Sequence, residues 1–336
     1  MADGMWTLAA AAIAFAVTGL LGKWMVPFLH KINFGQTIRE EGPKWHQKKS
    51  GTPTMGGFMF IVGIFVSAAL CLFLFYKNSG QNPNDMNLHV KLIGGMLMAL
   101  GFGGVGFLDD YIKVVKKRNL GLNERQKLIL QFLVAGGYLA SLYLSGASSV
   151  TLIPFFGGVD LGIAYWVLAL LGIVAMVNAV NFTDGIDGLN ASVTFFVSLA
   201  FMVIAGIVGI NGMSILSAAC AGGCLGFLIW NFNPAKVFMG DTGSLFLGGM
   251  VCALAFGLNM PVLLLPAGII YICEIASVVL QVTYFKATHG KRLFKMSPIH
   301  HHFEMCGWSE VKICTVFSMV TLLFGALGAA AVWFGL

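Results

Sequence analysis

Charged residues are scarce in this chain: they make up 10% of its 336 residues, whereas a soluble globular protein contains about 25%. Hydrophobic residues account for 58% of the chain, and its mean hydropathy is +0.85. This composition excludes a soluble enzyme and a disordered protein, because neither class carries so much apolar side chain. It is typical of a chain that crosses a lipid bilayer several times.

The sequence also lacks the signatures of several soluble enzyme classes. It contains no Walker A, HExxH or GxSxG motif, and its seven cysteines show no zinc-knuckle spacing. All of the cysteines except Cys306 lie in or against apolar runs, which excludes a disulfide scaffold. The pattern Gly101-x-Gly103-x-x-Gly106 matches a dinucleotide fingerprint, but it lies inside an apolar run, where close helix packing explains it.

Ten apolar runs are long enough to cross a bilayer as helices, which need about 20 residues each. Uninterrupted runs of this length are helical, because a membrane barrel would show short alternating segments instead. We therefore expect an all-α polytopic membrane protein with about ten transmembrane helices, forming one integral-membrane domain over residues 1–336. The runs cover residues 6–29, 55–76, 91–108, 128–145, 162–180, 189–210, 213–230, 242–259, 261–285 and 312–335.

Positive charge is concentrated in alternate loops. One set of loops holds nearly all the lysines and arginines, and the opposite set has only Lys77 and Lys91. Because basic loops stay in the cytoplasm, this pattern predicts cytoplasmic basic loops and two extracytoplasmic termini. The net charge of +6 then reflects orientation and contact with anionic membrane lipids rather than binding to nucleic acid.

Five aspartates stand at the predicted cytoplasmic ends of these spans, in three separate segments. Ionisable side chains at membrane depth are costly, and they usually mark a functional site. Since all five lie near one membrane boundary, we expect them to converge on one centre at the cytoplasmic face. A solvated helix end is the alternative for Asp109 and Asp110, and a simple helix cap is the alternative for Asp241. They are Asp109, Asp110, Asp184, Asp187 and Asp241.

The third cytoplasmic segment, NAVNFTDGIDGLN, has no basic residue, and polar side chains recur in it every three residues, at Asn178, Asn181, Asp184 and Asp187. Glycine at positions 185 and 188 lets the backbone approach a ligand closely, so we expect this segment to bind a substrate.

Within the ninth apolar run, Glu274 is either paired inside the bundle or part of a pathway.

The fifth cytoplasmic segment, KRLFKMSPIHHHFEMCGW, is cationic and contains three consecutive histidines. We interpret it as a phosphate-binding segment. A zinc site is the less favoured alternative, because consecutive residues of a helix point in different directions and three such histidines cannot chelate one metal.

Carboxylate oxygens, cationic side chains and glycine turns at a lipid boundary fit Mg²⁺ and a phosphate-bearing reaction. Because a soluble kinase needs no scaffold of ten membrane spans, one substrate is expected to be a lipid. These features predict phosphoryl-group transfer from a water-soluble diphosphate to a lipid phosphate. An ion-coupled transporter is the alternative from another class, and it is disfavoured because transporters place ionisable groups near the bilayer midplane.

Five strings closely resemble the MraY family, the phospho-N-acetylmuramoyl-pentapeptide transferases of the polyprenyl-phosphate N-acetylhexosamine-1-phosphate transferase superfamily. They are KSGTPTMGG from Lys49 to Gly57, DDYIK from Asp109 to Lys113, NFTDGIDGL, FMGDTGS and PIHHHFE. The aspartate strings are shared across the superfamily, whereas TPTMGG and PIHHHFE are closer to the muramoyl branch. A sibling transferase that moves GlcNAc-1-phosphate to a polyprenyl phosphate is the nearest alternative.

The resemblance implies that UDP-MurNAc-pentapeptide and undecaprenyl phosphate react to give lipid I and UMP, with Mg²⁺ as cofactor. This is the first membrane step of peptidoglycan synthesis. The resemblance also implies a bacterial plasma-membrane location, a homodimer and inhibition by nucleoside antibiotics. Of two possible mechanisms, direct attack by the lipid phosphate is preferred over a covalent intermediate on an aspartate.

The same resemblance implies roles for individual residues. Asp241 is expected to bind magnesium, with Asp109 and Asp110 beside the metal and the lipid phosphate, and with Asp109 as the candidate base. The other expected catalytic residues are Lys113, His300, His301 and His302. The expected substrate-binding residues are Lys49, Thr54, Asn178, Asn181, Asp184, Gly185, Asp187, Asn231 and Phe238, of which Phe238 stacks on uracil.

Overall fold

The computed structural model describes residues 2–31, 49, 51–79, 86–115 and 121–336. In this part of the chain, ten helices are long and apolar enough to cross a membrane, which confirms the predicted number of spans. The chain is therefore a multi-pass membrane protein. The helices are α1 (Ala2–Lys31), α2 (Gly57–Ser79), α4 (Gly95–Val115), α5 (Glu124–Leu144), α6 (Ile163–Thr183), α7 (Leu189–Ile207), α8 (Asn211–Asn231), α9 (Gly240–Gly257), α11 (Ile269–Ala287) and α13 (Glu310–Gly335), with the short α3 (Met86–His89) and π-helix η2 (Val90–Gly94) leading into α4.

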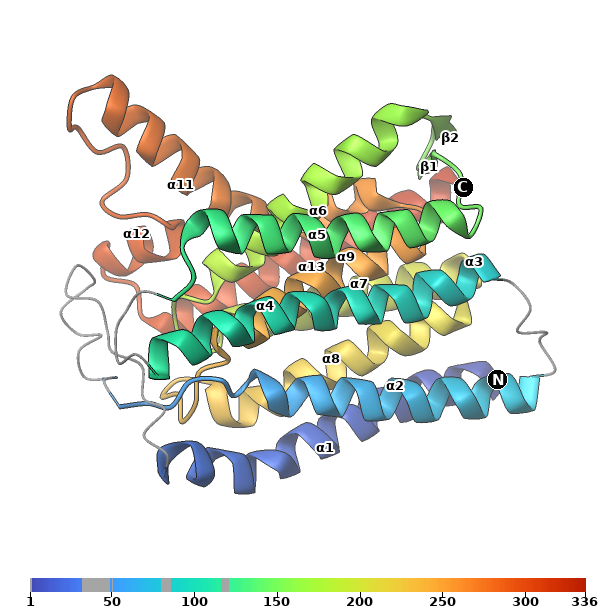
Figure 1. Ribbon diagram of the computed structural model, residues 1–336, viewed down its shortest axis with the longest axis horizontal. Coiled ribbons are helices and arrows are strands. Elements are labelled where there is room, and N and C mark those ends of the chain that lie inside the picture. The colour runs from blue at the N-terminus through green and yellow to red at the C-terminus, as the bar shows by residue number, and fades with distance from the viewer. Residues whose placement is uncertain (1, 32–48, 50, 80–85, 116–120) are drawn as a thin grey trace.

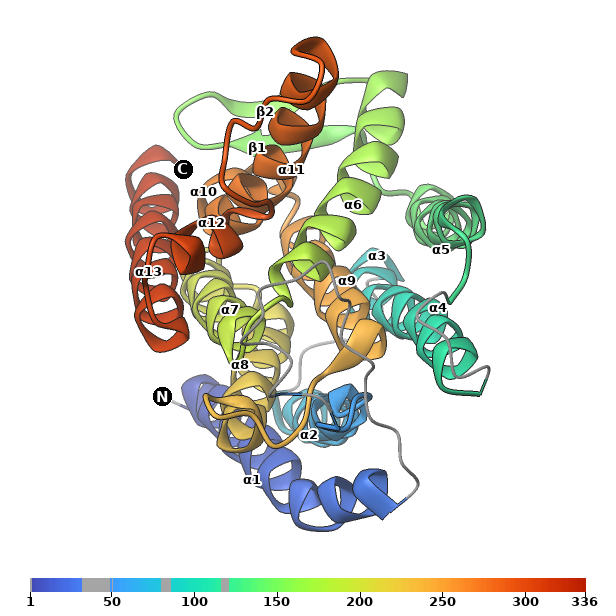
Figure 2. The same ribbon diagram turned by 90° about the vertical axis from the view of Figure 1, so that its left-hand side faces the viewer.

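The start of α1 and the end of α13 lie at the same end of the bundle, on the right of Figure 1. The opposite end carries the start of α9, the end of α4 and the short helix α12 (Ile299–Met305). Figure 2 looks onto that opposite end and shows α9 in the middle of the bundle, with α2, α4, α6 and α8 around it. Segments distant in sequence therefore meet there.

Helix α9 forms the centre of the core, because every residue from Thr242 to Gly257 is buried. Small residues let its neighbours approach closely. A methyl group on Gly106 of α4 would overlap the carbonyl oxygen of Asp241, and one on Gly249 would lie 2.7 Å from the Cα of Ala99. The glycines of the apparent dinucleotide fingerprint are thus packing residues, as the sequence indicated.

The ninth apolar run, expected as one span over 261–285, is divided. It contains a 3-10 turn η3 (Pro261–Leu263), a short helix α10 (Leu264–Ala267) and then α11. Pro266 has no backbone N–H to continue a helix, and Gly268 follows it. In Figure 1, α11 extends away from the bundle towards the upper left.

A β-hairpin connects α5 to α6, in a stretch that falls between two predicted spans. Strands β1 (Val150–Ile153) and β2 (Gly157–Asp160) pair antiparallel, with Val150 opposite Asp160. The hairpin is bound to the bundle by hydrogen bonds from the backbone N–H of Leu152 to Asn259 and of Phe155 to Gly335. It was not predicted, because its strands are only four residues long and lie between the apolar runs.

Candidate active site

Three of the five predicted aspartates meet at one end of the bundle. Asp109 and Asp110 lie in the last turns of α4, and Asp241 lies in the first turn of α9. One carboxylate oxygen from each lies within 4.8 Å of the other two. The close contact between Gly106 and the backbone of Asp241 brings the two helices together at this point.

Two lysines neutralise part of this acid cluster, defined as Asp109, Asp110 and Asp241. The ammonium of Lys113 pairs with Asp109 and lies 2.9 Å from Oδ2 of Asp241. The ammonium of Lys127, on α5, lies 3.0 Å from the same oxygen. Sequence reasoning assigned Lys127 only to membrane orientation, because its contact with α9 depends on how α5 packs.

The acid cluster suits a hard divalent cation. All of its charged donor atoms are carboxylate oxygens, which are the ligands that Mg²⁺ prefers, and three carboxylates exceed two lysines in charge. Asp110 is already engaged, because its two oxygens accept hydrogen bonds from the first turn of α9. Asp109 and Asp241 are paired instead with the ammonium groups of Lys113 and Lys127, which a bound cation could displace. They are therefore the residues best placed to hold a metal.

The last turn of α6 contributes one amide to the cluster. Asn181 donates from Nδ2 to Oδ1 of Asp241 at 2.9 Å and to the hydroxyl of Ser244 at 2.7 Å. Asn178, one turn earlier, is held away from the cluster by a reciprocal amide pair with Gln131 of α5. Of the two asparagines, only Asn181 reaches the acid cluster.

Asp184 differs from the other aspartates because its carboxylate has no hydrogen bond or ion pair among the described residues. Burial raises the pKa of this carboxyl well above its ordinary value, and the negative charges of Asp241, Asp110 and Asp187 raise it further. Carboxyl groups with a strongly perturbed pKa are typical of functional sites.

Comparison with known proteins decides the family. The Glycosyl transferase family 4 model matches residues 92–259. The chain is 46% identical over 324 residues to the phospho-N-acetylmuramoyl-pentapeptide-transferase of Bacillus mycoides (strain KBAB4), covering 96% of both chains. It is 47% identical to that of Geobacillus kaustophilus (strain HTA426) over 95% of both chains, and 45% identical to that of Clostridium botulinum (strain Alaska E43 / Type E3) over 96% of both. This chain belongs to the phospho-N-acetylmuramoyl-pentapeptide transferase family. The family resemblance found in the sequence is thereby confirmed.

In this transferase, the predicted nucleotide contacts Lys49 and Asp187 take part in an ion-pair network. The ammonium of Lys49 lies 2.7 Å from Oδ1 of Asp187 and 2.6 Å from Oε1 of Glu310, at the start of α13. Glu310 also accepts a hydrogen bond from the backbone N–H of Asp187, and Asp187 accepts one from Ala235. Sequence reasoning missed Glu310, because it precedes the last apolar run with no motif around it.

Two further segments run side by side next to this network. The backbone N–H of Phe238 donates to Pro53, and that of Gly56 donates to the carbonyl of Phe238, both at 2.8 Å. Asn231 donates to the carbonyl of Val237 and accepts from the N–H of residue 188. Thr54 is buried beside them, whereas the Phe238 side chain remains partly exposed.

The three histidines of α12 face different partners. Nδ1 of His300 contacts Glu274, Nδ1 of His301 contacts Glu304, and Nδ1 of His302 accepts a hydrogen bond from the backbone N–H of Lys295. They do not converge on one centre. Glu274 is thus paired inside the bundle, which is one of the two roles that the sequence left open for it.

Proposed function

We propose that this chain transfers phospho-MurNAc-pentapeptide from UDP-MurNAc-pentapeptide to undecaprenyl phosphate, giving lipid I and UMP. The observation that carries the proposal is that phospho-N-acetylmuramoyl-pentapeptide transferases match it at 46% identity over 96% of the chain. The convergence of three carboxylates and two lysines at the end of a membrane bundle supports the same chemistry.

Asp109 and Asp241 would hold the Mg²⁺ ion, and Asp241 would be its main ligand. When bound, this ion would neutralise charge on the substrate diphosphate and on the departing UMP. Lys113 and Lys127, which compensate the carboxylates in the described structure, would then be free to contact phosphate oxygens. His301 and His302 would line the side of the site that receives the sugar and peptide.

Direct attack by the lipid phosphate is the mechanism that we propose. The second pKa of a phosphate monoester is about 6, so the nucleophile is already largely dianionic at neutral pH and needs little help from a base. Asp109 already accepts a hydrogen bond from the N–H of Leu122 and pairs with Lys113, so it is stabilised as a carboxylate that can bind a cation. Asp109 would therefore orient the nucleophile and hold metal. Radiolabelled sugar phosphate trapped on the protein without lipid would contradict direct attack.

The nucleotide would bind over the 184–188 segment. Asp184 offers an unpaired carboxylate for sugar or base hydroxyl and N–H groups, Gly185 leaves the backbone accessible, and the partly exposed ring of Phe238 would stack on uracil. Lys49, Thr54, Asp187, Asn178 and Asn231 would support this site through the contacts described above.

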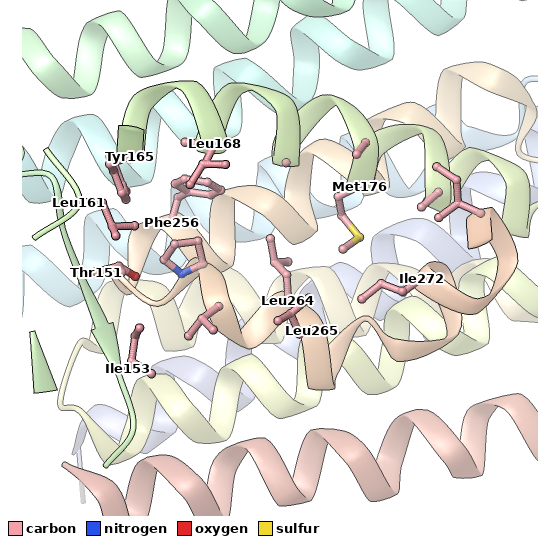
Figure 3. A pocket seen from close by; sticks show the side chains of 17 residues that line it. Thr151, Ile153, Leu161, Tyr165, Leu168, Met176, Phe256, Leu264, Leu265 and Ile272 are labelled. Atoms are coloured by element: carbon pink, nitrogen blue, oxygen red, sulfur yellow. The ribbon is translucent and has the colours of Figure 1, made fainter. Parts of the chain in front are cut away.

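The lipid tail would lie in an apolar pocket of about 440 Å³ beside α6. Figure 3 shows this pocket between α6, β1 and the α10–α11 segment, lined by side chains such as Leu168, Met176 and Ile272. It reaches Ala179 on α6, which precedes Thr183 and Asp184 by about one turn. A polyprenyl chain in this pocket would present its phosphate toward the acid cluster.

The charge distribution supports a cytoplasmic active site. Lys113 and Lys127 stand at the same end of the bundle as the acid cluster, and basic residues favour the cytoplasmic side. We propose that this end faces the cytoplasm of a bacterial plasma membrane, where the soluble nucleotide substrate would reach it.

One assay tests the proposed function. The purified protein should release UMP from UDP-MurNAc-pentapeptide only when both undecaprenyl phosphate and Mg²⁺ are present. UDP-GlcNAc, offered in a parallel reaction, should not support release. Turnover of UDP-GlcNAc in place of the muramoyl substrate would assign the chain to the sibling GlcNAc-1-phosphate transferases instead.

A further inference from the structure

Glu274 on α11 is a buried acidic residue that the transfer chemistry leaves without a role. Its side chain is 0% exposed, and Oε2 lies 3.0 Å from Nδ1 of His300. Its other oxygen has no hydrogen-bond partner among the described residues. Since burying a carboxylate is costly unless it is paired, the contact with His300 is the interaction that stabilises Glu274 in the bundle.

His300 is oriented by this contact. Its imidazole is 0% exposed at the start of α12, and Nδ1 is committed to Glu274. Nε2 therefore points elsewhere, and it lies against Gly185, where an added methyl group would overlap it. In the part of the chain that the structure describes, Nε2 has no hydrogen-bond partner.

The 184–188 segment is held from two sides. At Asp187 it is bound by Lys49 and by the backbone N–H of Ala235. At Gly185 the contact is the Nε2 edge of His300. Asp184, whose carboxylate is unpaired, precedes this second contact directly, so a shift of the imidazole would move Asp184 relative to the acid cluster.

We propose that Glu274 is a positioning residue: through Nδ1 it fixes the imidazole of His300, whose Nε2 edge holds Gly185 and Asp184 in place for the nucleotide substrate. A carboxylate that orients a histidine which itself acts on a third group is a recurring arrangement in enzyme sites. The inference rests on the proposed function, because it assigns Glu274 to the nucleotide side of that reaction.

Two conservative variants separate positioning from charge. Glu274→Gln keeps the length of the side chain and an oxygen that accepts the Nδ1 hydrogen bond, but it loses the negative charge. Glu274→Asp keeps the charge and is one methylene too short to reach His300. Positioning predicts that Glu274→Asp raises the KM for UDP-MurNAc-pentapeptide about 10- to 100-fold, whereas Glu274→Gln stays within about threefold of the wild type. The KM for undecaprenyl phosphate should not change in either variant.

The matched control is Ser277→Ala. Ser277 is buried one turn further along α11, and its hydroxyl only donates to the carbonyl of Glu274 within the same helix, at 2.7 Å. This variant should keep both KM values. Gly185→Ala approaches the same contact from the other side, and it should raise the nucleotide KM selectively even if Glu274→Asp fails to fold.

The double variant Glu274→Asp/His300→Ala should be no worse than His300→Ala alone, because Glu274 acts through the imidazole. The positioning role would be overturned if the effects of Glu274→Asp and His300→Ala multiplied in the double variant, or if both KM values changed equally. It would also be overturned if Glu274→Gln were worse than Glu274→Asp, or if Gly185→Ala left the nucleotide KM unchanged. Failure of the wild type to release UMP would instead contradict the proposed function itself.

Discussion

The carboxylate of Asp110 and the hydroxyl of Thr242 form a hydrogen bond of 2.7 Å that joins the end of α4 to the first turn of α9. The same carboxylate accepts hydrogen bonds from the backbone N–H groups of Asp241 and Thr242, at 3.2 and 2.9 Å. The first N–H groups of a helix have no partner within it, and the residue before α9, Met239, supplies no side-chain cap. Asp110 therefore caps the helix that carries Asp241.

Removing this cap should lower both the stability of the fold and the transferase activity. Asp110→Ala leaves two N–H groups of the first turn of α9 unpaired, one of them fully buried. We therefore expect it to lower the free energy of unfolding by about 3 kcal/mol and to abolish UMP release. Thr242→Val removes only the hydroxyl donor at nearly constant shape, and we expect a loss of about 1 kcal/mol with activity largely kept. Unfolding in a denaturing detergent measures both. A stable Asp110→Ala variant that needs more Mg²⁺ would show that Asp110 is a metal ligand instead.

Replacing Asp241 should lower activity without lowering stability, since its carboxylate faces the acid cluster rather than the helix backbone. Asp241→Asn preserves the shape of the side chain and removes the charge that Lys113 and Lys127 share. We expect kcat to fall by at least about 100-fold while the melting temperature stays close to that of the wild type. Treatment with EDTA should inactivate the wild type, and added Mg²⁺ should restore it. Substantial activity of Asp241→Asn at saturating Mg²⁺ would remove Asp241 from the metal site.

The parts of the molecule that could be predicted from the sequence are those encoded locally. Each membrane span is a run of apolar residues, so the ten helices were found with small errors at their ends. The meeting of Asp109, Asp110 and Asp241 could also be inferred, because all three stand at the same membrane boundary. In a membrane protein, residues at the same boundary are restricted to one plane. This restriction allowed the three aspartates to be predicted as neighbours although no sequence pattern shows their contact.

What could not be predicted depends on partners far away in the chain. Gln131 pairs with Asn178, Glu310 pairs with Lys49, and no local pattern links either pair. The hydrogen bonds that make Asp110 a cap exist only because α4 packs on α9. The break before α11 is marked by Pro266 and Gly268, but apolar residues continue on both sides of them, so the stretch was predicted as one span.

Phe238 is expected to contact only the nucleotide substrate. Its side chain is partly exposed, and Asn231 links the preceding residue, Val237, to Gly188. A ring that stacks on uracil adds affinity beyond simple burial. We expect Phe238→Ala to raise the KM for UDP-MurNAc-pentapeptide about tenfold and to leave the KM for undecaprenyl phosphate unchanged. Phe285→Ala, at an exposed phenylalanine of α11, is the control and should change neither. Equal effects of Phe238→Ala on both substrates would argue against stacking.

The unpaired carboxylate of Asp184 is expected to cost stability at neutral pH. Its pKa is raised by burial and by the charges of Asp241, Asp110 and Asp187, whereas in the unfolded chain it returns to about 3.9. The folded protein therefore holds this proton more tightly than the unfolded chain does. The free energy of unfolding should fall as the pH rises from about 3.9 towards the folded pKa, and the loss is complete above it.

Asp184→Asn should remove this loss, so the variant should melt at a higher temperature than the wild type at pH 8. The difference should shrink as the pH is lowered. Because Asp184 is also proposed to bind the nucleotide, the same variant should show a higher KM for UDP-MurNAc-pentapeptide, as expected when a binding site is built at the expense of stability. Asp187→Asn gives the opposite sign and serves as the control, since Asp187 pairs with Lys49 and its loss leaves that lysine with less compensation. Thermal unfolding of the wild type and the two variants between pH 5 and pH 8, in one detergent, tests whether the carboxylate of Asp184 costs stability. A lower melting temperature for Asp184→Asn than for the wild type at pH 8 would mean that this carboxylate has a partner in the folded protein.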